Sequence, residues 1–164
     1  MPDFSKLYQK PVGEAKRPPT MPGMTAPGII RQYEIVESRE KKTPGVKYYI
    51  SLTGWGPEAP QSWSEIDEDG KKWDYTRDDI DLGRRQFEYS FWFPVDASTG
   101  EPSTMGMYMF EQFLKTTSIS WEGMSYEQVF PSLVGSTVNV ELVQQLNPTS
   151  NRVYTSINKI SGLK

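Results

Sequence analysis

The chain of 164 residues contains neither cysteine nor histidine. Without cysteine it has no disulfide, no thiolate metal site and no thiol nucleophile. Without histidine it lacks the commonest general base and the commonest metal ligand. Catalysis would have to use carboxylate, lysine, tyrosine or serine groups. We therefore expect no catalytic residue, no metal and no cofactor, and a protein that is not an enzyme.

Long apolar runs are missing as well. Hydrophobic residues make up only 36% of the chain, and no stretch approaches the roughly 20 apolar residues that a membrane span needs. The first residues lack the apolar block of a signal peptide. We expect a cytoplasmic protein that makes no membrane contact, and the length suits one folded domain.

Negative charge is concentrated in one part of the chain. Residues 58–81 hold nine acidic and three basic residues, a local balance of −6, whereas the net charge of the chain is −3. The rest therefore carries +3, and this distribution matters more for nucleic-acid binding than the sum. We interpret 54–84 as a long irregular insertion, a kind of loop that is usually functional or disordered. Its three tryptophans argue against full disorder.

Aromatic residues are abundant, with seven Phe, nine Tyr and five Trp. In 86–95 aromatic residues alternate with mostly polar ones, which predicts a strand with one buried face. The residues of that face are Phe87, Tyr89, Phe91 and Phe93. The segment 104–117 places Met109, Phe110, Phe113 and Leu114 on one side at helical spacing, which predicts an amphipathic helix.

Alternation predicts four further strands, at 28–38, 46–55, 136–145 and 152–160. On the second strand we expect Val46, Tyr48, Ile50 and Leu52 to face the core. On the last strand the expected inward residues are Val153, Thr155 and Ile157. A capping box formed by Ser125 and Gln128 predicts a second short helix.

Six prolines in residues 1–27 predict an extended N-terminal arm. The arm is either a disordered tail or a strap lying across the folded domain or a neighbouring subunit, with Lys10, Lys16 and Arg17 available to phosphates.

Three strands, a helix and two strands are the order of the oligonucleotide/oligosaccharide-binding (OB) fold, a five-stranded Greek-key barrel. We therefore predict a mainly β protein in which residues 28–164 form an OB-fold barrel with one helix between strands three and four. The Pro-rich arm precedes the barrel, and the acidic insertion at 54–84 lies between strands two and three.

Three segments resemble small phage-encoded single-stranded-DNA-binding proteins of the OB-fold type. They read DFSKLYQKPVGEAKRPPTMPGM at 3–24, YEIVESREKKTPGVKYYISLTG at 33–54 and VGSTVNVELVQQLNPTSNRVYTSINKISG at 134–162. The likeness covers most of 3–52 and 85–162 and includes the near-terminal strand from Tyr154 to Ile160, whereas the acidic insertion is unusual for this family. The resemblance implies sequence-nonspecific binding and protection of single-stranded DNA in phage replication or recombination, in the cytoplasm of the infected host cell. It also implies that the protein is a homo-oligomer and that it interacts with phage or host replication proteins.

Proteins that bind single-stranded nucleic acid stack its bases on exposed aromatic rings and bind its phosphate backbone with cationic side chains. Residues of these types that lie on the predicted strands or at their ends are our candidates for the DNA-binding site. They are Arg31, Tyr33, Lys47, Tyr48, Tyr49, Trp55, Trp92, Arg152 and Tyr154.

Two other functions remain open at this stage. The first is a virion or complex assembly protein that uses the barrel and the N-terminal arm for protein contacts. The second is a metal-dependent hydrolase with Asp78, Asp79, Asp81 and Glu88 as ligands, although we prefer to interpret the three aspartates as a solvated acidic turn, because their spacing matches no known metal-binding loop.

Overall fold

The computed structural model describes residues 2–13 and 15–163. Its helices and strands are α1 (Ser5–Tyr8), β1 (Met24–Glu37), β2 (Pro44–Leu52), β3 (Ser62–Ile66), β4 (Lys72–Thr76), the 3₁₀ turns η1 (Arg77–Asp79) and η2 (Leu82–Arg84), β5 (Gln86–Trp92), α2 (Thr104–Thr116), α3 (Tyr126–Ser132), β6 (Thr137–Asn147) and β7 (Arg152–Gly162).

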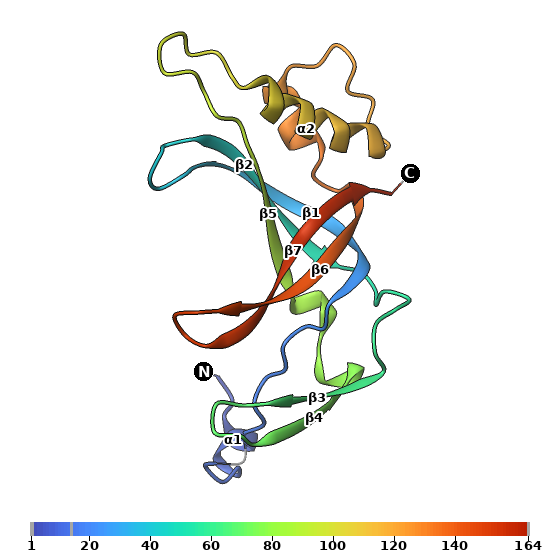
Figure 1. Cartoon of the computed structure of the whole chain (residues 1–164). Helices are drawn as coiled ribbons and strands as arrows, with labels where there is room; N and C mark the ends of the chain where they lie inside the picture. The colour runs from blue at the N-terminus through green and yellow to red at the C-terminus, as the bar shows by residue number, and fades with distance from the viewer. Residues whose placement is uncertain (1, 14, 164) are drawn as a thin grey trace.

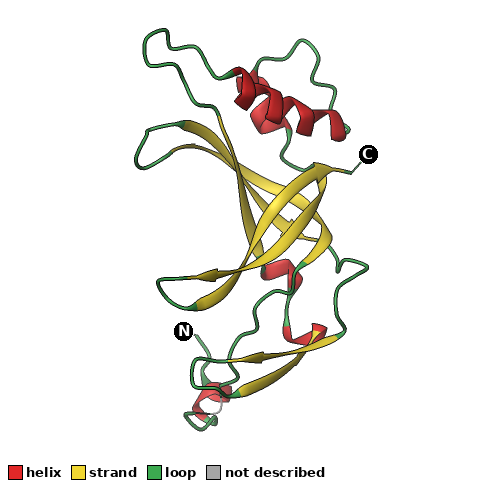
Figure 2. Cartoon of the chain, viewed as in Figure 1, coloured by secondary structure: helices red, strands yellow, loops and turns green. Residues whose placement is uncertain are grey.

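Five strands form one antiparallel sheet in the order β5-β2-β1-β6-β7, and β3 and β4 form a separate hairpin (Figures 1 and 2). The long strand β1 pairs with β6 through its first half and with β2 through its second half. The edge strands β5 and β7 lie near each other but do not pair, so the described strands form no closed barrel. The predictions of a mainly β chain and of a helix between the third and fourth strands of this sheet are confirmed.

The core lies on the inner face of the curled sheet and is closed at one end by α2 and α3 (Figure 2). All four residues predicted to face inward from β2 are buried. The fully buried ring of Phe110 on α2 joins the elements at this end, with its centroid 5.0 Å from that of Phe91 on β5 and 5.4 Å from that of Phe130 on α3. The aromatic strand and the helix thus form the core that their patterns predict, except at Met109, which we predicted on the buried side of the helix and which is exposed.

The segment 54–84 is not the irregular insertion that we predicted. Its middle is the hairpin β3–β4, in which Trp63 pairs with Tyr75 and Glu65 with Trp73. The turn is fixed by Asp67, whose carboxylate accepts hydrogen bonds from backbone amides, and by Gly70, whose φ of +81° suits glycine. Each strand has only five residues, too few for alternation to be clear beside so many charges.

The strand β1 begins four residues earlier than predicted, because Pro27 does not interrupt it. The carbonyl oxygen of Pro27 accepts a hydrogen bond from the backbone amide of Thr53, which lies just beyond the end of β2. The N–H that proline lacks would point to this same edge of β1, and this edge faces away from β6. A proline is tolerated in a strand at such a position. Met24 and Ala26 are buried, and the predicted arm therefore ends before Met24.

The strand β7 extends past the core, which corrects one of its predicted inward residues. Ile157 is buried, but Val153 lies opposite Leu146 near the tip of the β6–β7 hairpin, and both are exposed. Alternation identifies the face on which a side chain lies, but not where along the strand the core stops.

Candidate nucleic-acid interface

The outer surface of β2 and β5 carries Lys47, Tyr49 and Trp92, which we call the Trp92 face. Lys47 and Tyr49 alternate with the buried residues of β2. Trp92 lies opposite Gly45 and is therefore diagonal to Lys47, which pairs with Ser90. The Trp92 side chain is 41% exposed. Three of the predicted binding residues are thus brought together on one side of the sheet.

The position of the Trp92 ring depends on Gly45. A Cβ atom on Gly45 would lie 2.5 Å from Cε3 of Trp92 and 2.8 Å from the carbonyl oxygen of Phe91. The indole therefore lies directly over the backbone of β2, with no side chain between them.

Gly45→Ala is expected to displace the Trp92 ring and to lower the free energy of unfolding by about 1–3 kcal/mol, the usual cost of overpacking. Urea denaturation and the near-ultraviolet circular dichroism of tryptophan measure the two effects. Gly54→Ala is the matched control, because its Cβ would meet only Cγ of Pro27 at 3.5 Å. Equal behaviour of the two variants would contradict the role given to Gly45.

Carboxylates accompany the polar groups of the Trp92 face. Lys47 Nζ lies 3.3 Å from Oε2 of Glu88. The Tyr49 hydroxyl donates to Oε2 of Glu34 over 2.6 Å, and this hydrogen bond raises the pKa of Tyr49 to about 12. The charged groups named here are one lysine and two glutamates, so the strands of this face offer rings without an excess of cations.

The loop 38–43, which we call the cationic loop, adjoins the Trp92 face in the chain. It contains Arg39, Lys41 and Lys42, and within the described chain none of them forms an ion pair. The loop joins β1 to β2 just before Gly45, next to Trp92, and projects from the sheet (Figure 1). This loop separates the strands predicted at 28–38 and 46–55, and our candidates for the site did not include its cations. Three basic residues within four positions were the available signal.

Tyr48 does not belong to the interface. It is fully buried, and its hydroxyl donates to the carbonyl oxygen of Phe130 over 3.1 Å. Burial raises its pKa. The ring cannot stack on a base without opening the core, so its inclusion among the binding residues was wrong.

Arg31 and Tyr33 are exposed, but they do not extend the Trp92 face. A bulge in β1 between Ile30 and Gln32 shifts the register. Tyr33 therefore pairs with the inward-facing Tyr48 and lies at the open margin of the inner face. The bulge breaks the alternation that would place Arg31 and Tyr33 on one face of the strand predicted at 28–38.

Trp55 lies where β2 leads into the β3–β4 hairpin. Its ring is half-buried, with its centroid 6.3 Å from that of Trp63, and the guanidinium of Arg77 lies 5.2 Å from it. Trp55 thus packs between the hairpin and the sheet, away from Trp92.

Arg152 and Tyr154 lie at the start of β7 on its outer side, which we call the β7 tip. Tyr154 is 44% exposed and donates to Oε1 of Gln145 over 2.7 Å. Arg152 Nε lies 3.1 Å from Oε1 of Glu68, on the turn of the β3–β4 hairpin. The β7 tip therefore forms a second group of predicted residues.

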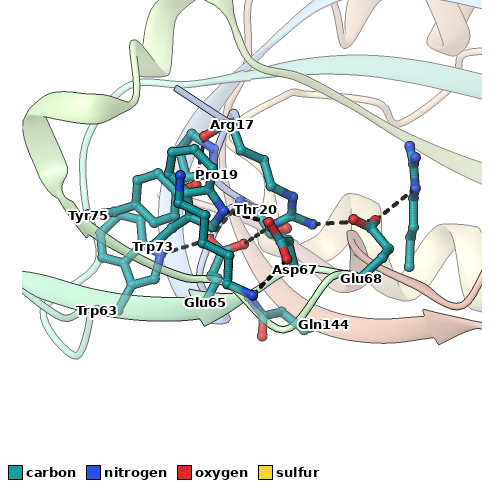
Figure 3. Close-up of polar contacts among 12 residues, drawn as sticks. Arg17, Pro19, Thr20, Trp63, Glu65, Asp67, Glu68, Trp73, Tyr75 and Gln144 are labelled. Carbon is teal, nitrogen blue, oxygen red and sulfur yellow. Dashed lines mark hydrogen bonds and ion pairs between the residues drawn. The ribbon is translucent and has the colours of Figure 1, made fainter. Parts of the chain in front are cut away.

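Residues 16–23 form a strap between the β3–β4 hairpin and the sheet (Figure 3). The Tyr75 hydroxyl donates to the carbonyl of Arg17 over 2.6 Å, and Gln144 Nε2 donates to that of Met21 over 3.1 Å. Met21 is buried. This part of the arm is therefore a strap across the domain, whereas α1 is exposed.

Three of the four acidic residues considered as metal ligands have other partners, and the ion pair of Glu88 with Lys47 is described above. Asp79 accepts from Lys16 and from the amide of Thr76, and Asp81 accepts from the amide of Gly83. Among the described residues, no group of three or more acidic side chains is arranged to hold a metal ion.

Comparisons with known proteins assign this chain to no family. A scan against protein-family models and a search of curated proteins find no match to this sequence. None of the helices in the described residues is long and apolar enough to cross a membrane.

Proposed function

We propose that this protein binds single-stranded DNA without sequence preference and without catalysis, and protects it during phage replication or recombination. The observation that carries the proposal is the exposed Trp92 ring on the sheet surface beside the cationic loop. Aromatic rings flanked by cations are the usual platform for single strands, because every base has a face that can stack.

The strand order supports an OB fold, in which the third and fifth strands of the barrel would be β5 and β7. Proteins of this fold bind oligonucleotides on the face of strands two and three and with the loops that join strands one to two and four to five. Here those parts are the Trp92 face, the cationic loop and the turn before the β7 tip. The resemblance to phage single-stranded-DNA-binding proteins supports this assignment, and on that basis we propose the cytoplasm of the infected cell as its location.

Removing the three cations of the cationic loop together, by Arg39→Ala, Lys41→Ala and Lys42→Ala, is expected to weaken DNA binding. It should also reduce the slope of log K against log salt by about 2, because each phosphate contact on a single strand contributes about 0.7. Fluorescence anisotropy of a labelled dT oligonucleotide at several salt concentrations measures both quantities.

The control for this variant removes the same charge elsewhere, by Lys71→Ala, Lys72→Ala and Lys115→Ala. If both triple variants lose affinity equally, net charge and not the cationic loop governs binding. An unchanged salt slope in the loop variant would contradict its contact with phosphates.

A second candidate, an assembly protein, is favoured by the exposed apolar side chains of the arm. Phe4, Leu7, Tyr8 and Val12 are all exposed and are available to another chain. Measurement of the mass in solution, with and without oligonucleotide, distinguishes the two functions. Self-association without any affinity for DNA would favour assembly.

A further inference from the structure

Two arginines from distant parts of the chain meet at one carboxylate oxygen (Figure 3). Oε1 of Glu68 lies 3.1 Å from Nε of Arg152 and 3.9 Å from Nη2 of Arg17. Arg17 comes from the strap, Arg152 from the β7 tip and Glu68 from the turn of the β3–β4 hairpin. An oxyanion between two guanidinium groups is the arrangement by which arginines also recognise phosphate.

We propose that Glu68 occupies the place of a DNA backbone phosphate, and that single-stranded DNA displaces it to bind between Arg17 and Arg152. The proposal rests on the proposed function. It adds to it a second phosphate site, at which Glu68 of the same chain competes with the DNA phosphate. The hairpin turn then lowers the affinity of the β7 tip for DNA.

Arg17 is held in place independently of Glu68. Its Nη1 lies 3.4 Å from Oε1 of Glu65, and its carbonyl accepts from Tyr75. Glu65 is itself fixed, because its Oε2 accepts from Nε1 of Trp63 over 3.0 Å and from the amide of Thr20 over 2.9 Å. The Glu65 side chain is only 15% exposed. This carboxylate therefore orients Arg17 and stays in place when a phosphate arrives.

Glu68 is held much less firmly than its neighbours. Its side chain is 45% exposed and that of Arg152 is 70% exposed, and ion pairs of such exposure contribute little to stability. Asp67, by contrast, accepts from Nε1 of Trp73 and from two backbone amides, and these hydrogen bonds lower its pKa, the one from Trp73 most. Glu68 can thus leave while Asp67 keeps the hairpin turn intact.

Tyr154 gives this phosphate site a place for a base. It lies two residues beyond Arg152 on the same side of β7, a separation of about 6.6 Å along a strand. Its ring is exposed, and its hydroxyl is occupied by Gln145. A nucleotide with its phosphate at Arg152 would place its base against this ring, where stacking requires no particular sequence.

The test compares Glu68→Gln with Asp69→Asn, which removes the same charge from the same turn without touching either arginine. Glu68→Gln is expected to tighten binding of a labelled dT oligonucleotide by up to about fivefold at low salt, the equivalent of about 1 kcal/mol. Asp69→Asn should tighten it much less. Adding Arg152→Ala to Glu68→Gln should abolish the gain.

The outcomes separate this proposal from the proposed function. Wild-type binding with no gain from Glu68→Gln, or an equal gain from both single variants, would overturn the displacement while leaving DNA binding intact. A wild-type protein that does not bind single-stranded DNA would overturn both. An unchanged urea midpoint for Glu68→Gln confirms that the comparison is between folded proteins.

Discussion

Trp92→Ala is expected to weaken binding to a dT oligonucleotide of about 30 nucleotides by roughly 5- to 150-fold, or about 1–3 kcal/mol. The indole is the largest exposed ring on the Trp92 face and lies over Gly45 beside the cationic loop. Its removal takes away a stacking surface but leaves the cations in place. The affinity should therefore fall while the dependence on salt stays nearly the same.

Two further variants make this result specific. Trp92→Phe keeps a ring over Gly45 and should retain most of the affinity. Tyr108→Ala removes an exposed ring from α2, outside the Trp92 face, and should leave DNA binding unchanged. A loss for Tyr108→Ala as large as that for Trp92→Ala would mean that DNA does not bind where we propose.

Phe110→Ala is expected to lower the free energy of unfolding by about 3–5 kcal/mol, the usual cost of removing a fully buried aromatic side chain. The Phe110 ring contacts Phe91 on β5, Phe93 just after β5, Phe113 on α2, and Tyr126 and Phe130 on α3. Because these neighbours are held by different elements, we expect them to fill only part of the space that the ring leaves. A large cavity therefore remains between the sheet and both helices.

Urea denaturation followed by circular dichroism measures this loss. Phe110→Leu, which keeps much of the apolar volume, should cost less than half as much as Phe110→Ala. A loss below about 1 kcal/mol for the alanine variant would show that α2 and α3 do not share one core with the sheet.

The elements that the sequence predicts best are those whose aromatic and apolar residues recur with one clear period, of either a strand or a helix. The alternating rings from Phe87 to Phe93 and the helical spacing of Phe110, Phe113 and Leu114 each describe one face against one core, and burial confirms both. The β3–β4 hairpin was missed because its strands are short. Its two tryptophans also receive partners, Glu65 and Asp67, from within the charged segment itself.

The candidate site was only partly predictable, because binding residues need exposure as well as the right chemistry. Alternation placed Lys47 and Tyr49 outside and, by the same reasoning, placed Tyr48 inside. The bulge in β1 cannot be predicted from the local sequence pattern, and it places Tyr33 on the inner side of the sheet instead of the outer side. The pairing of Glu68 with Arg152 joins two hairpins that are far apart in the sequence, and it follows from the fold rather than from any spacing in the sequence.

The most direct test of DNA binding at the Trp92 face is a tryptophan fluorescence titration of the wild-type protein and of Trp92→Phe with unlabelled dT oligonucleotide of about 30 nucleotides at two salt concentrations. We expect saturable quenching that weakens as salt rises, and a much smaller quenching amplitude in Trp92→Phe despite continued binding. No quenching at low salt, together with no binding by anisotropy, would contradict single-stranded-DNA binding. Equal quenching in both proteins would show that the bases stack elsewhere.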